Sequence, residues 1–409
     1  MKQSLSSVRQ PKRFDYALLV ILCLICITSL IAIYSSSPFL PSYLNGASQT
    51  IRQFAFYVLG AAIVFAIMHI GNENLYDFAV LGYKIVLFML FYLFIDSILS
   101  RFISPGYNVL PFAHMVNGAN SWFDFPIIGT LQPSEFMKII LIIITAYIIK
   151  EHNENKVEES FEADLDLVFK LAKWALPPLI LILIQPDTGI FIIIFFSIAL
   201  MVACSGIRKE WIYAVFIIVG IAIILFFLIY NFAPSLFDAI FAGGGYKSGR
   251  IYGWLDPEGN INGSGLQLYT ALISIGSAGL NGHDLTTAIL PSIPEAHTDF
   301  IFAVIGLCYG FIGSLFVVAL CASLDIRLFI IASKTNDQVE KLMITGFIGM
   351  IIFQQIENIG MVIGLLPITG ITLPLISYGG SSLLSYMICF GIIFNASSKA
   401  KRLSDYVYG

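Results

Sequence analysis

The sequence carries little charge. Only 12% of its 409 residues are Asp, Glu, Lys or Arg, while 58% are hydrophobic; soluble domains carry about 25% charged residues. This balance excludes a soluble globular domain and indicates a polytopic membrane protein. The formal net charge of −4 says little about partners, because the charges lie in loops where their local sign matters more than their sum.

Three other features are missing. No disulfide framework is indicated, because all the cysteines fall within or at the ends of apolar runs and suit packing better than redox or metal chemistry: Cys23, Cys26, Cys204, Cys308, Cys321 and Cys389. No small-residue cleavage site follows the first apolar run, which predicts a retained helix rather than a signal peptide. No convincing internal repeat favours an inverted-repeat transporter.

What the chain does contain is long apolar runs. A helix crosses a bilayer with about 20 apolar residues, in a range near 17 to 25. We therefore expect an all-α fold with about ten transmembrane helices, near residues 14–35, 54–70, 77–99, 134–150, 168–185, 188–205, 210–232, 298–322, 342–363 and 371–396.

Lysine and arginine in the short connections predict the orientation, because they favour the cytoplasmic side. They gather before the first expected span and after the fourth, sixth, eighth and last, which all lie on one side if the number of spans is even. The acidic run 151–166 is then a solvated cytoplasmic connection. We expect one membrane domain over residues 1–409, in the bacterial cytoplasmic membrane, with these parts outside the bilayer: cytoplasmic tails 1–13 and 397–409, and a long extracellular loop 233–297.

The loop from Gly243 to Asp299 is the most polar stretch beside an expected span. Its ionisable residues lie among glycines, which let a backbone bend or approach a ligand closely: Lys247, Arg250, Asp256, Glu258, His283, Asp284, Glu295, His297 and Asp299. An ordinary solvated loop is the alternative, but an unstructured loop of this length is uncommon in a compact protein. We predict that this loop carries chemistry.

A second polar group enters the fourth expected span. Pro133 suits a helix start, and Glu135 and Lys138 lie three residues apart on one helix face. They are either a local ion pair at a capped helix start or, as ionisable groups at membrane depth, part of a functional site. Trp122 is better explained as an interface anchor than as a ligand contact from composition alone.

Two further groups interrupt apolar runs. Asp187, in the sequence QPDTG, is a cap for the next helix or a site residue. Beyond Glu357 and Asn358, the glycines and prolines of 364–382, with Ser377 among them, predict broken helix ends that line a polar cavity.

These motifs together resemble one known family over nearly the full chain. They read, in order, GANSW, LQPSEFMK, QPDTG, GSG with SIGSAGL, PEAHTDFIFAVIG and GLLPITGITLPLISYGGSS. The sequence resembles the SEDS family (shape, elongation, division and sporulation), whose members include RodA, FtsW and SpoVE.

The resemblance implies a ten-helix peptidoglycan glycosyltransferase that polymerises lipid II at the outer membrane face, in elongation, division or sporulation. It implies lipid II, a growing glycan strand and a class B penicillin-binding protein as partners, and no nucleic acid. Such a transfer needs a base for the acceptor hydroxyl, cations for the leaving diphosphate and an apolar groove for the lipid tails.

The chain departs from the family at the position of the essential carboxylate. Asn260 stands there and cannot act as a base near neutral pH, and Leu307 and Cys308 replace a common acidic pair. Either Asp256 or Glu258 takes over as base, or the protein is a scaffold that regulates a penicillin-binding protein. A lipid II flippase is a third hypothesis.

The remaining site residues follow from the resemblance. Lys138 and Arg250 are expected to bind the diphosphate, and the other contacts to substrate are Trp122, Glu135, Asp187, Gln267, His297, Asp299 and Ser377. His297 bonded to a nearby carboxylate, and Asp299 as a helix cap, are the structural alternatives. A divalent cation, Mg²⁺ or Mn²⁺, between Asp256, Glu258 and Asp299 is left open, since their spacing matches no known ligand signature.

Overall fold

A computed structural model describes residues 14–41, 43–103, 108–116, 119–125, 129–156, 158–241, 246–283 and 293–408. The elements in chain order are α1 (Tyr16–Ser35), η1 (Ser37–Phe39), α2 (Gly46–Ile70), α3 (Leu75–Phe102), β1 (Ala113–Val116), β2 (Ala119–Phe125), β3 (Gly129–Leu131), α4 (Pro133–Asn155), α5 (Phe161–Ile184), α6 (Thr188–Ala203), α7 (Lys209–Phe232), α8 (Pro234–Phe241), α9 (Tyr246–Leu255), α10 (Leu266–Ser277), α11 (Ile301–Lys334), α12 (Gln338–Val362) and α13 (Gly380–Tyr408). Asp284, the tail 1–13 and Gly118, the first residue of GANSW, lie outside the described residues.

The long helices coincide with the expected spans. Helices α1 to α7 and α11 to α13 each cover one predicted segment. Within the described ranges, eight helices are long and apolar enough to cross a membrane. Of the other two, α6 has only 16 residues and α4 carries charge near both ends. The fold is that of a helical, polytopic membrane protein.

Several predicted boundaries are wrong, and local capping explains two of them. Helix α2 begins at Gly46 because the Asn45 side chain accepts hydrogen bonds from the amides of Ala47 and Ser48. Helix α5 begins at Phe161, where Ser160 accepts from the amide of Ala163. The acidic run 151–166 is therefore largely helical, in α4 and α5. The last span begins at Gly380 rather than 371, because residues 371–379 form an irregular segment, and α13 continues through the expected tail to Tyr408.

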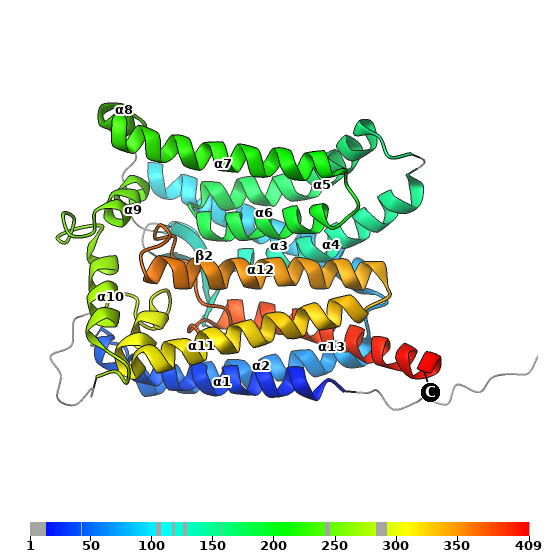
Figure 1. The fold of residues 1–409 in the computed structure, drawn as a ribbon, viewed down its shortest axis with the longest axis horizontal. Coiled ribbons are helices and arrows are strands. Elements are labelled where there is room, and N and C mark those ends of the chain that lie inside the picture. Colours follow the sequence, from blue (N-terminus) through cyan, green and yellow to red (C-terminus); the bar gives the residue numbers. More distant parts are fainter. Residues whose placement is uncertain are drawn as a thin grey trace, which may run out of the picture.

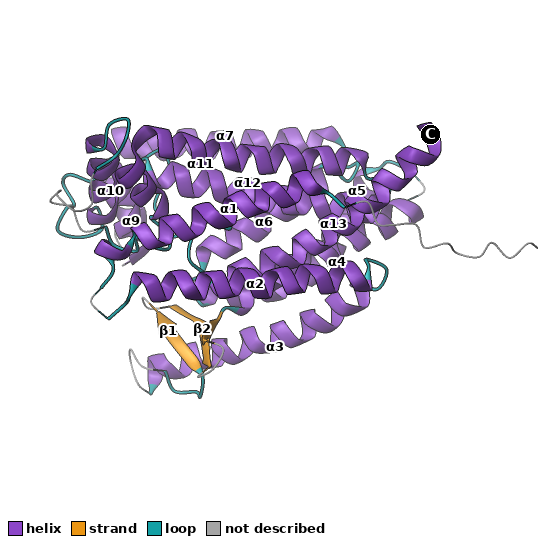
Figure 2. Cartoon of the chain, turned by 90° about the horizontal axis from the view of Figure 1, so that it is seen from below, coloured by secondary structure: helices purple, strands orange, loops and turns teal. Residues whose placement is uncertain are grey.

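A small antiparallel sheet, in the order β1-β2-β3, was not predicted. It pairs Trp122 with His114 and Phe123 with Leu131, and it leads directly into α4 at Pro133. Figure 2 shows the sheet beside one end of α3. The polar residues before the fourth span are thus held by backbone pairing rather than by a loose loop.

The helices lie side by side, and the long loop closes one end of the bundle. In Figure 1, α1 begins and α13 ends at one end, whereas α8, α9 and α10 lie at the other. If the chain crosses the membrane an even number of times, its first helix must begin and its last helix must end at the same end of the bundle, as α1 and α13 do here. Helices α4, α12 and α13 are largely buried, whereas no residue of α7 is. The bundle therefore has a protein-covered centre and a lipid-facing side.

Helix α11 is broken at Gly310, where the backbone has a positive φ of 63°. Residues 279–283 pair with the break: the amide of His283 donates to Leu307 O at 2.9 Å, and those of Phe311 and Ile312 donate to Gly279 O and Leu280 O. A Cβ on Gly310 would meet Leu280 and Gly282 backbone atoms at 2.5 Å. The end of the long loop is therefore joined to a membrane helix by backbone hydrogen bonds.

At the opposite end, a buried ion pair joins α1 to α11 and α13. The Asp15 carboxylate, 1% exposed, accepts two bonds from Arg327 Nη2 at 2.6 and 2.7 Å and one from Ser397 Oγ at 2.6 Å. Asp15 also caps α1 by accepting from the Leu18 amide. Removing its charge leaves a partly buried guanidinium without its counter-charge.

We predict that Asp15→Asn, which keeps the cap oxygen, lowers the free energy of unfolding by about 3–5 kcal/mol, the range for breaking a buried pair. Thermal unfolding of the purified protein in detergent would show this as a lower midpoint. Lys170→Ala is the control, because Lys170 and Asp166 form a half-exposed pair and such pairs contribute little. Equal midpoints for Asp15→Asn and Lys170→Ala would contradict the assignment.

Candidate active site

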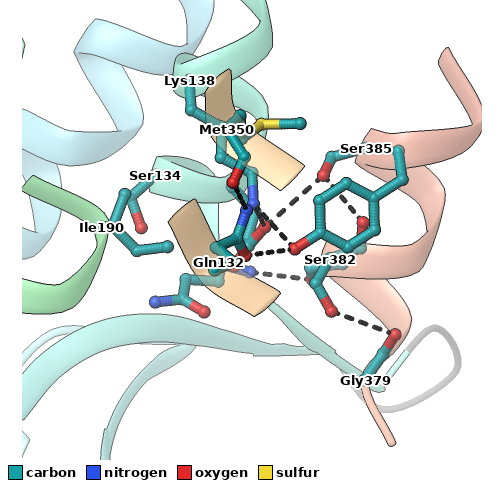
Figure 3. A network of polar contacts seen from close by, with 12 residues as sticks. Gln132, Ser134, Lys138, Ile190, Met350, Gly379, Ser382 and Ser385 are labelled. Atoms are coloured by element: carbon teal, nitrogen blue, oxygen red, sulfur yellow. Dashed lines mark hydrogen bonds and ion pairs between the residues drawn. The ribbon is translucent and has the colours of Figure 1, made fainter. Parts of the chain in front are cut away.

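The predicted pair on α4 is present and fully buried. Lys138 Nζ lies 2.5 Å from Glu135 Oε2, and the two side chains are 1% and 7% exposed. Lys138 also donates to Tyr386 Oη on α13 at 3.3 Å, and its Nζ lies 4.4 Å from the centre of that ring. Figure 3 shows the contacts around Lys138. The ion pair is therefore a junction between helices rather than a local contact on one helix face.

Asp187 extends the same region. Its Oδ2 accepts from Gln132 Nε2 at 2.8 Å and Ser134 Oγ at 3.1 Å, and its Oδ1 caps α6 at Ile190. The predicted cap is therefore confirmed. Burial raises the pKa of Asp187 to about 6, and the nearby Glu135 adds to the shift, while the hydrogen bonds oppose it. The carboxylate holds the starts of α4 and α6 together.

The turn between α9 and α10 holds the predicted base residues. Asp256 and Glu258 are exposed and Asn260 is half-buried. Asp256 Oδ1 accepts from the amide of Gly259 at 2.9 Å, and Asn260 Nδ2 donates to Asp256 O at 2.8 Å. Asn260 thus closes a turn whose two carboxylates face solvent.

Glycines hold the ends of this turn together. A Cβ on Gly253 would lie 2.5 Å from Ser264 O, and one on Gly265 would lie 2.6 Å from Pro257 O. No larger residue fits this backbone approach without a shift. The two ends of the turn are therefore held close together by backbone contacts.

Helix α9 is attached to the segment between α12 and α13. Arg250 Nη1 donates to Thr369 O at 2.6 Å, and Trp254 Nε1, one helical turn later, donates to Gly364 O at 3.0 Å. Gly364 and Gly370 both have a φ of +79°. The predicted broken helix end at this segment is present, and it positions the turn that carries Asp256.

Asp299 lies against the same segment. A Cβ on Gly370 would be 3.2 Å from Asp299 Oδ2 and 3.4 Å from Arg250 Nη2, so the carboxylate and guanidinium flank one glycine. Burial raises the pKa of Asp299 to about 8; the Glu295 and Glu357 carboxylates add to the shift and Arg250 opposes it. The alternative explanation of Asp299 as a cap of α11 is wrong, because Phe300 holds the cap position and no side chain caps it.

The backbone at His297 and Thr298 is hydrogen-bonded to Ser377 and Tyr378, at the end of the same segment. Ser377 Oγ donates to Thr298 O at 2.7 Å, and the Tyr378 amide donates to His297 O at 2.9 Å. His297 Nδ1 is buried without a hydrogen bond among the described residues, and burial lowers its pKa. The expected bond from its ring to a carboxylate is not among the contacts of the described residues.

The predicted residues therefore fall into two groups. Glu135, Lys138 and Asp187 form a buried group between helices, and the second group lies on segment 364–378 or on the elements bonded to it: Arg250, Asp256, Glu258, Asn260, His297, Asp299 and Ser377. Trp122 and Gln267 are half-buried, on β2 and α10. Across the described ranges, no group of three or more His, Cys, Asp or Glu residues could hold a metal ion; the carboxylates Asp256, Glu258 and Asp299 form no such group.

Sequence reasoning missed several members of both groups. Tyr386 contacts Lys138 and donates to Gln354, and Gln132 donates to Asp187. Glu357 was noticed but not assigned to the site, and it acts electrostatically on Asp299. Only polarity inside an otherwise apolar helix could have indicated Gln354 and Glu357.

The chain is similar to known proteins over almost its whole length. The family model FtsW/RodA/SpoVE, described as cell cycle protein, matches residues 16–402. The chain is 32% identical to a probable peptidoglycan glycosyltransferase FtsW of Bacillus subtilis over 95% of this chain and 92% of that protein. It is 31% identical to stage V sporulation protein E of the same organism, over 94% and 96%.

Two solved structures share the fold. One belongs to a peptidoglycan synthase complex in which polymerization and crosslinking are coordinated, with a TM-score of 0.71, 24% identity and coverage of 95% of this chain and 98% of that one. The other is Thermus thermophilus rod shape determining protein RodA, with a TM-score of 0.60, 24% identity and coverage of 94% and 96%. By the family match and these relatives, the chain belongs to the FtsW/RodA/SpoVE family.

Proposed function

We propose that the protein is a peptidoglycan glycosyltransferase that polymerises lipid II at the outer face of the bacterial cytoplasmic membrane. The observation that carries the proposal is the match of almost the whole chain to relatives that bear this name. The polar turn at one end of an apolar bundle supports it, because a lipid-linked sugar presents its reacting atoms at the membrane surface. The reaction is an inverting transfer without a covalent intermediate.

The base in this proposal is Asp256 or Glu258. The family's carboxylate position is Asn260, whose amide is bonded to the backbone of the turn. Both nearby carboxylates are exposed on the same closed turn, where either can reach the 4-hydroxyl of an acceptor sugar. A catalytic base must lie within hydrogen-bond reach of the proton it removes. Glycines let the two ends of this turn pack closely, which favours a reproducible position of its carboxylates.

The diphosphate leaving group needs positive charge. Lys138 and Arg250 are the proposed partners, and Trp122, Gln267 and His297 the proposed wall or sugar contacts. Glu135, Asp187, Asp299 and Ser377 complete the proposed substrate site. Mg²⁺ or Mn²⁺ bound with the substrate diphosphate would add charge there.

In this proposal residues 1–409 form one membrane domain with both tails, 1–13 and 397–409, in the cytoplasm and the loop 233–297 outside. Its partner is a class B penicillin-binding protein, a crosslinking enzyme. The likeness in fold to a member of a synthase complex supports that pairing.

A scaffold without polymerase activity is the second candidate. The amide at Asn260 favours it, because the family position then lacks a base. Polymerisation of labelled lipid II by the purified protein, alone and with its penicillin-binding partner, separates the two. Partner binding without glycan would support the scaffold and contradict the enzyme.

We predict that the double variant Asp256→Ala with Glu258→Ala makes glycan at least ~100-fold more slowly, because general base catalysis contributes roughly 10²–10⁴-fold. Gel analysis of glycan ladders is the measurement. Glu73→Ala is the matched control, since Glu73 is an exposed carboxylate in the α2–α3 connection at the opposite end of the helices. Undiminished ladders from the double variant would exclude both carboxylates as the base.

We also predict that Asn260→Asp raises the polymerisation rate, because it returns a carboxylate to the family's position. The double variant combined with Asn260→Asp should regain glycan synthesis. A restored rate in that combined variant would support a base that has moved within one turn. No gain in either background would contradict this interpretation of Asn260.

A further prediction concerns pH and Asp299. Its native pKa of about 8 lies above the ordinary 3.8, so between these values the folded state holds a proton that the unfolded state has lost. Stability should therefore fall as pH rises through this window. We expect Asp299→Asn to remove that fall, so that its thermal midpoint improves relative to the wild type between pH 5 and pH 8. Parallel midpoint curves would contradict the buried state of this carboxyl group.

A further inference from the structure

Tyr386 contacts the Lys138 ammonium, and Gln354 in turn contacts Tyr386. The ammonium has three N–H donors. One goes to Glu135 Oε2 at 2.5 Å and one to Tyr386 Oη at 3.3 Å. Glu135 lies on the same helix, and its Oε2 accepts from Ser385 Oγ on α13 at 3.4 Å. Tyr386, also on α13, is the residue of that helix that contacts the ammonium directly.

The hydrogen bonds around Tyr386 have a defined direction. Gln354 Nε2 donates to Met350 O at 3.0 Å, which turns Gln354 Oε1 toward α13. Tyr386 donates its single proton to that oxygen at 2.6 Å. The tyrosine oxygen therefore accepts from Lys138 and has no proton to offer it. Gln354 is what keeps the tyrosine an acceptor.

This arrangement is rigid because its members are buried. Tyr386 and Gln354 are each 1% exposed, and they come from α13 and α12. The tyrosine ring lies 4.4 Å from Nζ, within the range of a cation–π contact. Without the tyrosine, the Glu135 carboxylate is the remaining partner of the ammonium among the described residues.

In this proposal, the ligand accepts a hydrogen bond from the third N–H of the Lys138 ammonium. The backbone amide of Gln132 donates to Ser381 Oγ at 3.0 Å, and both residues are half-exposed next to the buried cluster. Among the described residues, Lys138 Nζ has the two hydrogen-bond partners Glu135 and Tyr386, which leaves one N–H for a phosphate oxygen in this proposal. Charge-assisted bonds of this kind are about twice as strong as neutral ones.

We propose that Tyr386, oriented by Gln354, is a positioning residue that aims the Lys138 ammonium at the diphosphate of a lipid-linked substrate. The inference rests on the proposed function, because it takes the ligand to be a polyprenyl diphosphate. It adds residues on α12 and α13 to a site otherwise assigned to α4 and the outer loop.

The test is equilibrium binding of undecaprenyl diphosphate to the purified full-length protein in detergent, with undecaprenol as the uncharged probe. We expect Lys138→Met and Tyr386→Phe each to weaken diphosphate binding by about tenfold or more, the size of a lost hydrogen bond to a charged group. Undecaprenol binding should stay unchanged, because the lipid tail does not depend on the ammonium. A merely structural role for Tyr386 would change both probes together.

Two further variants sharpen the comparison. Gln354→Leu removes the acceptor and should weaken diphosphate binding, whereas Gln354→Glu keeps an acceptor oxygen and should bind nearly as the wild type does. Tyr83→Phe is the matched control, because it also removes a tyrosine hydroxyl that donates a hydrogen bond, in this case to the backbone oxygen of Trp174 at 2.9 Å. It should bind both probes normally.

The inference is overturned if Tyr386→Phe binds the diphosphate as the wild type does, or if it loses both probes equally. Wild-type binding by Lys138→Met would overturn it as well. The enzyme proposal is judged separately from glycan synthesis. A protein that makes no glycan, but shows the expected pattern of binding, would lose its proposed activity while keeping this site.

Discussion

A positive charge inside an apolar bundle has to be neutralised and hydrogen-bonded, and the centre of this protein is arranged to do so. The Lys138 ammonium on α4 is met by a carboxylate on its own helix and by a tyrosine on α13, which is oriented by a glutamine on α12. An unpaired charge there would cost several kcal/mol. Helices α4, α12 and α13 are thus joined through the side chain of Tyr386.

Buried polar groups also have to be hydrogen-bonded at the end of the bundle that carries α8, α9 and α10. There, backbone oxygens rather than side chains accept the hydrogen bonds. The helix break after Val362 exposes carbonyl oxygens, and Arg250 and Trp254 of α9 donate to them. Irregular backbone at membrane depth is tolerated where protein covers it. The polar loop therefore completes the bundle, and the bundle in turn holds the loop in place.

Local sequence predicted much of this structure. Apolar runs indicated the long helices, and the spacing of Glu135 and Lys138 indicated their ion pair. Asp187 was recognised as a cap because that interaction spans only a few residues. Boundaries were less accurate where a cap such as Asn45 starts a helix in polar sequence.

Contacts between distant residues could not be predicted in this way. Tyr386 is 248 residues from Lys138, and no periodicity in either helix indicates that the two meet. Asp299 precedes a helix as a cap would, yet its carboxylate faces Gly370 and Arg250 instead. The sheet was missed because β1 and β3 have only 4 and 3 residues, and the polar half of β2 resembles a loop.

The backbone pairing at Gly310 also limits where the chain can be altered. Residues 279–283 look from sequence like a surface turn, rich in glycine and open to insertions. Because their amides and carbonyls complete the broken turn of α11, an epitope tag inserted there would open a membrane helix. The exposed turn at Glu258, closed below by Gly253 and Gly265, is the more tolerant place to extend the chain, although any label there would lie beside the proposed base.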